Sequence, residues 1–488
     1  MKLRDILNGI PVKNITGDAD IDIKGIAYSS KDSDNDSLFA AFKGIKTDGN
    51  LYIKEALEKG ATAVLSERQA PEDFTQTWIQ VEDARETTAL LAGNFYEHPS
   101  KKIKVIGITG TKGKTTTSYL LESILNNSGN KAGVIGTVSY RFGNQEKPAS
   151  RTTPEALDIQ NMMKNMLDSG YTHCIIEVSS HALELKRVTG INFSVAIFTN
   201  LSGDHLDYHR TMEEYFTAKK KLFQLKSERR IAVVNADSSW GQRLISELPL
   251  GIISYGTGPS AIVRAEGFEF SSTGTKITVR YPTGTLFLNS ALLGRPNLFN
   301  ILAAVSTALS LNIPLPAIQK GISDLKEVPG RFEKIENKAG LNIFVDYAHS
   351  DDALRNLLET AREICTKKVI LVFGAGGDRD KSKRPRMGEI AGMLADWSII
   401  TSDNPRTEDP LKIISDIESG FKKSGSSAYE IEPNRKNAIF RALSMGESGD
   451  YILIAGKGHE DYQIIQDKVL PFKDADVVRE WLAQGEKN

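Results

Sequence analysis

The stretch that decides the fold is Val105-Ile106-Gly107-Ile108-Thr109-Gly110-Thr111-Lys112-Gly113-Lys114-Thr115-Thr116. Its apolar first half predicts a buried strand, and its glycines predict a tight turn that leads into a helix. A glycine-rich turn between a strand and a helix N-terminus is typical of a loop that binds nucleotide phosphates. In such a loop Lys114 can reach the β and γ phosphates, and Thr115 can bind magnesium.

This turn departs from the common phosphate-loop pattern at its start. Ile108 stands where the pattern GxxxxGK[ST] has its first glycine, so a glycine-rich turn without nucleotide is the alternative. The next segment has apolar Leu120, Leu121, Ile124 and Leu125 at helical spacing. The strand before the turn and the helix after it favour the nucleotide-binding interpretation.

Further apolar runs on both sides of this unit predict an α/β fold with three domains. Strands are expected at 174–178, 195–198 and 231–234, with helical patterns between several of them, which predicts a mainly parallel central sheet. Residues 262–289 alternate instead, which predicts antiparallel hairpins appended to this domain. After a turn at 328–331, a second series has expected strands at 343–347, 369–373, 397–401 and 451–455. Residues 1–100 predict a small mixed α/β domain.

The composition excludes several classes of protein. The 488 residues are 40% hydrophobic and 25% charged, and the formal net charge is -1, so neither nucleic acid nor an anionic membrane is an expected partner. Cys174 and Cys365 lie outside any CxxC spacing, which argues against a disulfide framework. The N-terminus lacks the apolar centre of a signal peptide, and no run is long enough to span a membrane. A cytoplasmic location is expected.

Polar side chains at the ends of the expected central strands are candidates for a metal site. Glu177 ends one strand, and the segment 200–209 after the next strand brings His205 and His209 to the same sheet edge. A hydrogen-bonded, partly buried imidazole is the alternative for each histidine, and we favour a functional role only for His205. Lys219 lies in a run of three lysines, and such a run is most often a solvated helix face.

The second series of strands also ends in polar or glycine-rich segments. These segments hold Asp346 and His349, residues 374–383, residues 403–406 and residues 456–460. Because ligands bind beyond the carboxyl ends of strands in open α/β sheets, the segments predict a second binding surface.

Eight short motifs in this order resemble those of the Mur ligase family. They are TGTKGKTT (109–116), EVSSH (177–181), DHLDYH (204–209), GRFE (330–333), DYAH (346–349), GDRDK (377–381), DNPR (403–406) and GKGHE (456–460). The resemblance spans essentially the whole chain. It implies a uridine-nucleotide domain at 1–100, a central P-loop ATPase domain at 101–330 and a C-terminal Rossmann-like domain for the amino acid at 331–488.

The resemblance also implies the activity. A Mur ligase of this kind forms carbon–nitrogen bonds with ATP in peptidoglycan precursor synthesis. The resemblance therefore implies a role in cell-wall biogenesis, cell shape and cell division. The expected reaction adds meso-diaminopimelate to UDP-MurNAc-L-Ala-D-Glu through an acyl phosphate. ATP and Mg²⁺ are the expected cofactors, and the chain is expected to act as a monomer.

The resemblance carries site residues over by motif. ATP is expected at Gly110, Thr111, Lys112, Gly113, Lys114, Thr115, Thr116, Asn297, Asn300, Arg331 and Asp346. Metal is expected at Thr115, Glu177, His205 and a carbamylated Lys219, and catalytic roles at Lys114, Glu177, His205, Lys219, His349 and Lys381. The muramoyl dipeptide nucleotide is expected at Ser29, Ser30, Thr152, Thr153, Ser179 and Arg187. The chain departs from close relatives at Pro296, where His is frequent, and at Leu185, where Gln is expected.

The expected third substrate has a zwitterionic distal end, which needs a cation and an acceptor together. Arg379 and Arg406 are expected to clamp its carboxylate, and Glu460 to receive its ammonium. The carbonyl of Gly456 and the side chain of Asn404 are expected to help. Asp403 and Pro405 complete the DNPR segment, which alone is equally an ordinary turn.

Four alternatives stay open at this point. A lysine-adding relative would need no carboxylate clamp, and folylpolyglutamate synthase should lack both the N-terminal domain and DNPR. A P-loop phosphotransferase or regulatory NTPase explains only residues 105–127, and amino-acid-dependent phosphate release would separate it from a ligase. A non-catalytic binding module is disfavoured because Lys114, Thr115 and Glu177 are all present.

Overall fold

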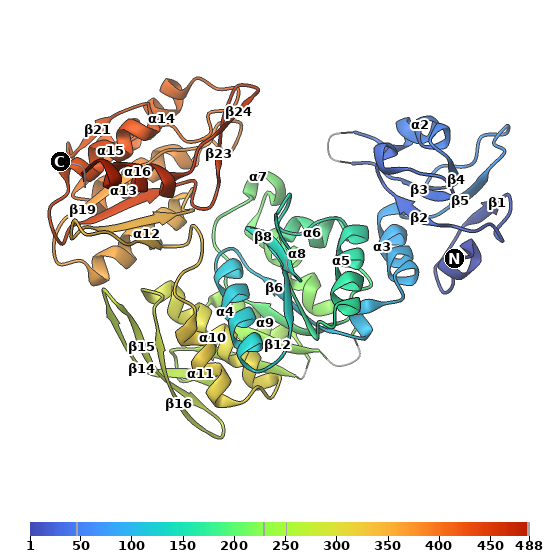
Figure 1. The fold of residues 1–488 in the computed structure, drawn as a ribbon, viewed down its shortest axis with the longest axis horizontal. Coiled ribbons are helices and arrows are strands. Elements are labelled where there is room, and N and C mark those ends of the chain that lie inside the picture. Colours follow the sequence, from blue (N-terminus) through green and yellow to red (C-terminus); the bar gives the residue numbers. More distant parts are fainter. Residues whose placement is uncertain (45–46, 144, 228–229, 250, 486–488) are drawn as a thin grey trace.

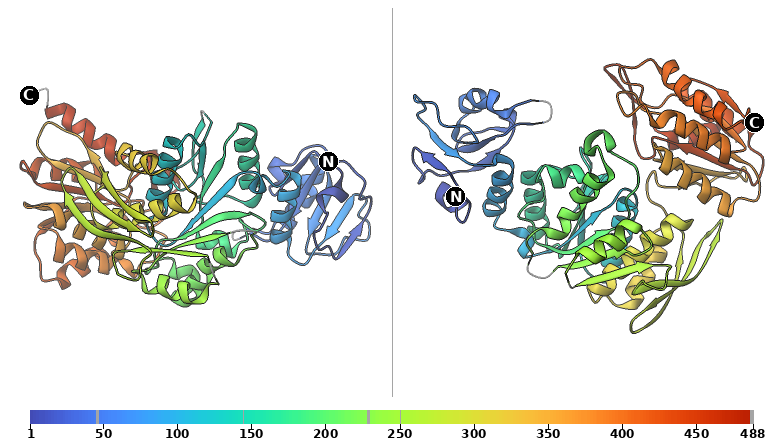
Figure 2. Two further views of the ribbon diagram at one scale, coloured as in Figure 1. Left: turned by 90° about the horizontal axis from the view of Figure 1, so that it is seen from below. Right: turned by 180° about the vertical axis from the view of Figure 1, so that it is seen from behind.

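Three sheet-containing domains follow one another along the chain in the computed structural model (Figure 1). The structure describes residues 1–44, 47–143, 145–227, 230–249 and 251–485. The N-terminal and C-terminal domains lie on opposite sides of the central domain in all views (Figure 2). The predicted α/β class with a mostly parallel central sheet is confirmed.

The N-terminal domain is built on a five-stranded sheet of order β1-β5-β4-β3-β2, in which only β1 is antiparallel to its neighbour. The strands are β1 (Asn14–Thr16), β2 (Gly25–Ala27), β3 (Ser37–Ala41), β4 (Ala61–Ser66) and β5 (Thr77–Gln80). The helices are α1 (Leu3–Ile6), η1 (Ser30–Asp32), η2 (Gly49–Tyr52), α2 (Ile53–Glu58), α3 (Ala84–Phe95) and η3 (Pro99–Lys101).

The central domain contains an eleven-stranded sheet of order β16-β15-β14-β13-β12-β11-β6-β10-β7-β8-β9. The strands are β6 (Lys104–Thr109), β7 (Ala132–Ile135), β8 (Ser139–Phe142), β9 (Gln145–Pro148), β10 (His173–Glu177), β11 (Phe193–Phe198), β12 (Ile231–Asn235), β13 (Ile252–Gly256), β14 (Val263–Ser271), β15 (Gly274–Tyr281) and β16 (Gly284–Ser290). The helices are α4 (Lys114–Asn127), α5 (Ala156–Asp168), α6 (Ser180–Glu184), α7 (Leu206–His209), α8 (Met212–Gln224), α9 (Ser239–Glu247), α10 (Arg295–Ser310) and α11 (Leu315–Asp324).

The predicted antiparallel hairpins at residues 262–289 are confirmed, but they extend the central sheet, so the expectation that they form an appendage was wrong. β14 pairs in parallel with β13 at Tyr255↔Val263, and β15 and β16 then continue the sheet as antiparallel strands. The alternating pattern arises because one face of this extension covers the apolar core around α10, while the other face is exposed.

The C-terminal domain has a six-stranded sheet of order β17-β18-β22-β19-β20-β21 and a separate hairpin β23-β24. The strands are β17 (Glu333–Ile335), β18 (Asn342–Asp346), β19 (Val369–Phe373), β20 (Trp397–Ile400), β21 (Tyr429–Ile431), β22 (Tyr451–Ala455), β23 (Tyr462–Ile465) and β24 (Lys468–Pro471). The helices are α12 (Asp351–Ile364), α13 (Lys383–Leu394), α14 (Pro410–Lys423), α15 (Arg435–Met445) and α16 (Asp474–Gly485). An apolar core on each face of the sheet explains why its parallel strands are continuous apolar runs.

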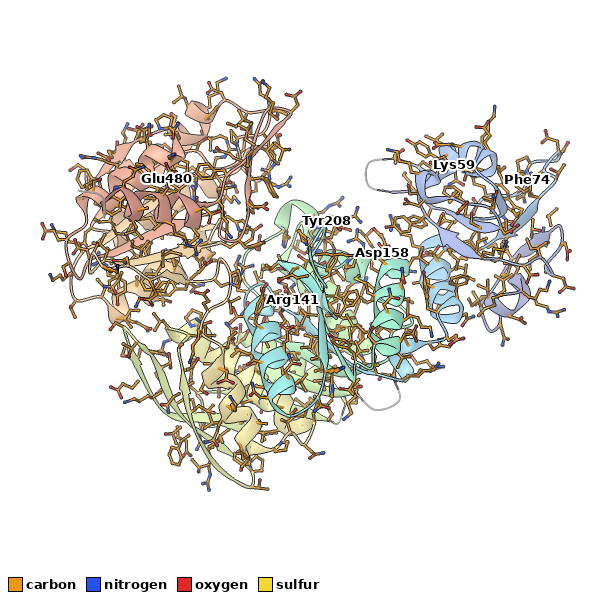
Figure 3. The ribbon with its side chains drawn as sticks, viewed as in Figure 1. Lys59, Phe74, Arg141, Asp158, Tyr208 and Glu480 are labelled. Atoms are coloured by element: carbon orange, nitrogen blue, oxygen red, sulfur yellow. The ribbon has the colours of Figure 1, made fainter. Side chains whose placement is uncertain are left out.

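Polar contacts join the N-terminal domain to the central domain. The Tyr28 hydroxyl donates to Asp158 at 2.7 Å, and Lys186 pairs with Asp83 at 2.6 Å. Asp158 lies on α5 at the side of the central domain that faces the N-terminal domain (Figure 3). Across the described ranges, no helix has both the length and the apolar character needed to cross a membrane.

A fully buried ion pair ties α15 to α16. The Arg435 guanidinium donates to both carboxylate oxygens of Asp474 at 2.7 Å, and both side chains are 0% exposed. We expect Asp474→Asn to lower the free energy of unfolding by about 3–5 kcal/mol, because it leaves a buried guanidinium without its counter-charge. Urea unfolding followed by circular dichroism measures this change.

A surface pair between the same two helices provides the control. Lys436 contacts Glu480, whose position Figure 3 shows, and both side chains are partly exposed. Lys436→Met should change the stability by less than about 1 kcal/mol. Equal losses in the two variants would contradict the argument from burial.

Candidate active site

The turn between β6 and α4 has the backbone that a phosphate loop needs. Gly110 and Gly113 have φ values of 147° and 87°, which L-residues rarely adopt. A Cβ at Gly110 would lie 1.9 Å from Thr199 Oγ1, and one at Gly113 would lie 2.3 Å from Asn300 Oδ1. The loop therefore packs against β11 and α10 with no room for side chains at these positions, and the N-terminus of α4 follows directly.

The two lysines of the loop have different surroundings. Lys114 Nζ donates to the carbonyls of Gly110 and Thr111 at 2.8 and 3.0 Å, and burial lowers its pKa to about 8. Lys112 pairs with Asp204 at 3.1 Å and donates to Ser350 of the C-terminal domain at 3.3 Å. Lys114 thus belongs to the loop alone, whereas Lys112 also joins two domains.

Glu177 lies at the end of β10, as predicted, and its carboxylate is almost fully buried. It accepts hydrogen bonds from Thr115 Oγ1 at 2.9 Å and from Thr137 Oγ1 at 2.7 Å. A Cβ at Gly136 would lie 2.4 Å from Glu177 Oε1, so this glycine makes room for the carboxylate. Thr115 and Glu177 are hard oxygen donors side by side at the phosphate loop, which is a donor set that suits magnesium.

Lys219 is a buried side chain and not part of a solvated helix face. It is 1% exposed, its Nζ donates to the Gly110 carbonyl at 2.9 Å, and it lies 4.4 Å from the centre of the Tyr215 ring. Burial, with a further effect from Lys114, puts its pKa well below the ordinary 10.5. A lysine amine without its charge is the form that can react with carbon dioxide.

The two histidines of segment 200–209 differ in their environment. His205 has a positive φ of 56°, and burial lowers its pKa to about 4, so its imidazole is neutral at pH 7 and can bind a metal. His209 is buried, stacks on Tyr215 at 4.9 Å and contacts Ser180 Oγ at 2.8 Å. Packing accounts for His209.

Across the described part of the chain, no group of three or more His, Cys, Asp or Glu side chains is arranged to hold a metal. Thr115 and Glu177 fit one magnesium ion whose other ligands are phosphate oxygens and water. A carboxylate formed on Lys219 would add a donor beside His205. The residues present therefore fit magnesium bound together with a nucleotide better than a permanent metal site.

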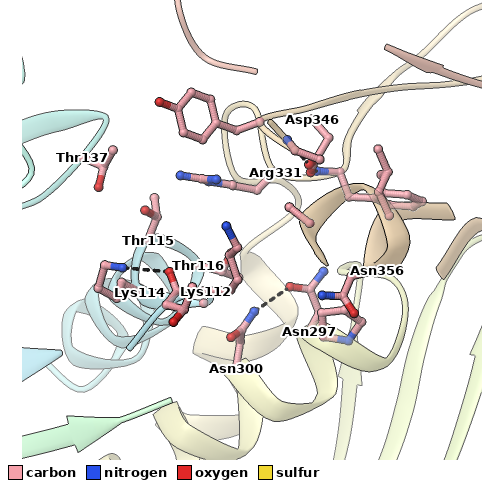
Figure 4. Close-up of a pocket in the computed structure, with 18 of the residues that line it drawn as sticks. Lys112, Lys114, Thr115, Thr116, Thr137, Asn297, Asn300, Arg331, Asp346 and Asn356 are labelled. Atoms are coloured by element: carbon pink, nitrogen blue, oxygen red, sulfur yellow. Dashed lines mark hydrogen bonds between the residues drawn. The ribbon is translucent and has the colours of Figure 1, made fainter. Parts of the chain in front are cut away.

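A pocket of about 310 Å³ lies between the phosphate loop and the C-terminal domain. Figure 4 shows Lys114 and Thr115 on one side and Arg331 and Asp346 on the other. The Asn300 amide donates to Asn297 at 3.0 Å on the pocket wall (Figure 4). All residues predicted for ATP line this pocket except Gly110.

Asp346 and Arg331 are held by their neighbours. The Asp346 carboxylate accepts the backbone N–H groups of Phe332 and Ala348 at 2.7 and 2.8 Å, and the Arg331 guanidinium lies 4.7 Å from the centre of the Tyr347 ring. Burial raises the pKa of Asp346. These contacts fix the segment that connects the central and C-terminal domains.

The structure places His349 and Lys381 apart. His349 lines the pocket, its Nδ1 donates to the Tyr347 carbonyl at 2.8 Å, and burial lowers its pKa to about 3. Lys381 is 68% exposed and pairs with Glu408 at 3.2 Å, away from the pocket lining. Lys383 lies closer, because its Nζ donates to the His349 carbonyl at 2.7 Å.

A second pocket lies between the N-terminal and central domains. Ser29, Ser30 and Arg187 line it together with Tyr28 and Arg85. Of the other residues predicted for the muramoyl nucleotide, Thr152 and Ser179 line the nucleotide pocket instead. The Thr153 carbonyl accepts from Arg187 at 3.0 Å, and the Thr153 hydroxyl donates to Ser179 at 3.3 Å. Thr153 therefore links the two pockets.

The residues predicted for the amino acid lie at the carboxyl ends of β20 and β22. Asn404 donates to Glu460 at 2.8 Å, and a Cβ at Gly456 would lie 2.5 Å from Asp403 Oδ2. Arg406 donates to the Gly377 carbonyl at 2.7 Å, with Pro405 between it and Asn404. Arg379 is exposed, and its guanidinium donates to the Asp378 carbonyl at 3.2 Å. The structure thus brings the DNPR segment and Glu460 together and leaves Arg379 at the edge.

Several pocket residues have no counterpart among the sequence predictions. Thr137, Asp204, Asn356 and Lys383 contact or line the site, and Arg85 lines the second pocket. Thr137 follows a short strand, and Asp204 lies in the segment after β11 from which only the histidines were predicted to act. For both residues, a position after a strand end was the sequence signal that could have identified them. Asn356 lies inside a helix, where a polar residue normally indicates a solvent-facing position.

Known proteins match the whole of this arrangement. Residues 22–96 match the family model "Mur ligase family, catalytic domain", residues 108–308 match "Mur ligase middle domain", and residues 330–458 match "Mur ligase, glutamate ligase domain". A protein of Caldanaerobacter subterraneus subsp. tengcongensis is 44% identical over 487 residues, or 100% of each chain. The chain belongs to the Mur ligase family.

The similar Mur ligases carry one name. The protein of Caldanaerobacter subterraneus is a UDP-N-acetylmuramoyl-L-alanyl-D-glutamate--2,6-diaminopimelate ligase, and one of the same name from Geobacter metallireducens is 44% identical over 98% of each chain. A solved structure with that name has a TM-score of 0.72 at 31% identity, and the match covers 100% of this chain and 99% of the other.

Gly113→Ala should disturb this Mur ligase's nucleotide pocket selectively. The added Cβ would meet Asn300 Oδ1 and would adopt an unfavourable φ, so we expect the KM for ATP to rise roughly tenfold or more. Gly129→Ala, after the other end of α4, is the matched control, because its φ is 79° but nothing lies within 4 Å. Steady-state kinetics with varied ATP measures both; an unchanged KM in Gly113→Ala would contradict the assigned loop geometry.

Proposed function

We propose that this chain is the ATP-dependent ligase that adds meso-diaminopimelate to UDP-MurNAc-L-Ala-D-Glu in peptidoglycan precursor synthesis. The observation that carries the proposal is the meeting of three binding surfaces at the phosphate loop. Thr152 and Ser179 lead from it to the N-terminal pocket, while Arg331 and His349 belong to the C-terminal domain and line it from the other side. Relatives that match over the whole chain and carry the corresponding name support the choice of substrates.

ATP would occupy the pocket of Figure 4, with its phosphates on the loop of residues 110–116. Magnesium would be held by Thr115, Glu177, His205 and a carbamylated Lys219, and it would neutralise negative charge on the phosphates. Burial lowers the pKa of the Lys219 amine, which supports carbamylation, because an ammonium is costly to bury and the modification would place an anion beside a bound cation.

The chemistry follows from the charges. A carboxylate is a poor electrophile until one of its oxygens becomes a leaving group, and the D-glutamyl carboxylate would gain that group by attacking the γ-phosphate. Lys114 would stabilise the charge that develops between these two anions. The amine of the incoming amino acid would then displace phosphate from the acyl phosphate, with His349 beside the reacting groups.

The amino acid would bind on the C-terminal domain. Arg406 would hold its distal carboxylate, and Glu460, Asn404 and the Gly456 carbonyl its distal ammonium, with Asp403 and Pro405 shaping the turn. Arg379 is free enough at the surface to move onto the same carboxylate. Lys383 contacts the His349 carbonyl, whereas Lys381 pairs with Glu408 away from the pocket, so a role of Lys381 near the phosphate would require it to leave Glu408.

The remaining assignments rest on sequence and contacts. We propose that residues 1–100, 101–330 and 331–488 are the uridine-nucleotide, ATPase and amino-acid domains. The small net charge and the two unpaired cysteines support a cytoplasmic protein that uses small molecules and needs neither nucleic acid nor a membrane. We further propose that it acts as a monomer.

An oxygen tracer tests the reaction type. With ¹⁸O in the D-glutamyl carboxylate, attack on ATP transfers one label to inorganic phosphate when diaminopimelate is present. The expected result is labelled phosphate in equal amount to the amide product. Unlabelled phosphate would contradict the acyl phosphate and favour a hydrolytic NTPase; phosphate on another acceptor would favour a phosphotransferase.

A further inference from the structure

Lys457 is a buried ammonium in the amino-acid site that the reaction described above does not use. Its side chain is 0% exposed, although lysine is rarely buried without a partner. Its Nζ lies 3.2 Å from Glu460 Oε2, 3.4 Å from Asn404 Oδ1 and 5.4 Å from the centre of the Tyr462 ring. Lys457 therefore contacts both side chains that would receive the substrate ammonium.

The hydrogen bonds of this group fix its orientation. Asn404 Oδ1 accepts from the Ile464 backbone N–H at 2.9 Å and from Lys457, so its Nδ2 must point the other way, to Glu460 Oε2 at 2.8 Å. Glu460 Oε2 thus takes two donors. Within the described residues Oε1 has no protein donor, which leaves one carboxylate oxygen for a ligand.

Among the four charged side chains that line the amino-acid site at the DNPR segment and after β22, two are acidic and two are basic when Lys457 is counted. Asp403 and Glu460 are acidic, and Asp403 Oδ2 is buried without a hydrogen-bond partner among the described atoms. Arg406 and Lys457 are basic. Burial raises the pKa of Tyr462, Glu460, Asp461 and Asp403 raise it further, and Arg406 opposes this, so these groups act on a common region. The exposed Asp461 is screened by solvent, and the two acidic and two basic side chains of the site together match a ligand end that carries one charge of each sign.

We propose that Lys457 is a positioning residue that sets the charge specificity of the amino-acid site: by neutralising one oxygen of Glu460, it makes the site accept a zwitterionic distal end in preference to a lone ammonium. This inference rests on the proposed ligase function. Without Lys457 the site would carry an uncompensated negative charge, which suits the distal end of L-lysine better than that of meso-diaminopimelate.

Two substitutions of opposite charge test the proposal. Lys457→Met removes the positive charge at similar length, and Glu460→Gln removes the negative one. The measurement is kcat/KM for meso-diaminopimelate and for L-lysine, from phosphate release at saturating ATP and muramoyl dipeptide nucleotide. Lys457→Met should lower the diaminopimelate-to-lysine ratio by about tenfold or more, mainly through the KM for diaminopimelate, and Glu460→Gln should raise it.

A structural role for Lys457 would give another pattern. Equal losses with both amino acids and an unchanged ratio in Lys457→Met would overturn the proposal, and an unchanged KM for ATP shows that the variant is folded. Lys436→Met, at the surface of the same domain, should leave the ratio as in the wild type. If Lys457→Met does not fold, Glu460→Gln decides, since a ratio that fails to rise refutes the charge balance. Wild-type protein that uses neither amino acid would refute the ligase function itself.

Discussion

Lys114→Met is expected to lower amino-acid-dependent phosphate release by roughly 10²–10³-fold. Among the described residues, the Lys114 ammonium donates to two backbone carbonyls and has no acidic hydrogen-bond partner, so it is available to the phosphates when ATP binds. The methionine keeps the length and the packing of the buried stem. The loss should appear chiefly in kcat, because the charge is needed most when two anions approach each other.

An exposed lysine provides the control for this variant. Lys54 is 90% exposed on α2 and makes a surface contact with Glu58, so Lys54→Met should retain wild-type activity. If Lys114→Met kept activity within a few-fold of the wild type, a catalytic role for this lysine would be contradicted.

Lys219→Ala is expected to lose activity to a similar extent, roughly 10²–10³-fold, and to regain part of it with acetate or formate. The side chain is buried behind the phosphate loop, so its removal leaves a space beside the Gly110 carbonyl that a small carboxylate can enter. Rescue by carboxylates and none by alkylamines would identify the lost group as an anion. Initial rates with increasing acetate measure it.

The neighbouring lysine tests whether the position matters. Lys221 lies on the same helix, α8, is partly exposed and pairs with Glu184 at 2.7 Å, so Lys221→Ala should keep its activity without added acetate. Full activity of Lys219→Ala, or rescue by methylamine in place of acetate, would contradict a carbamylated lysine.

The sequence predicted the parts of the fold in which local and tertiary preferences agree. The run Val105–Thr109 is apolar, β-branched and followed by glycines, and it forms a fully buried central strand. Buried parallel strands are continuous apolar runs, which is why Val369–Phe373 and Tyr451–Ala455 were found with their observed bounds.

The pairing of residues 262–290 with the central sheet could not be predicted from the sequence. Their alternating pattern predicts hairpins, but the pairing of Val263 with Tyr255 depends on a tertiary contact that no local signal encodes. The same limit applies to the site. Glu177 could be found from its strand end, whereas Thr137 and Asn356 meet the pocket only because separate elements pack together.

Lysines illustrate why residue type alone was insufficient. Lys219, Lys381 and Lys457 all lie in charged or glycine-rich segments, yet their exposures are 1%, 68% and 0%. Only the packing of α8 and of the segment after β22 shows which of them are buried. Burial changes the protonation and the partners of a lysine, and therefore its possible chemistry.

Competition between the two candidate amino acids shows which of them the enzyme joins to the muramoyl dipeptide. Purified protein would receive ATP, magnesium, UDP-MurNAc-L-Ala-D-Glu and equal concentrations of meso-diaminopimelate and L-lysine, and mass spectrometry would identify the nucleotide product. We expect the diaminopimelate tripeptide as the main product, with one ADP formed for each amide. A lysine tripeptide as the main product, or ADP formed without any tripeptide, would contradict it.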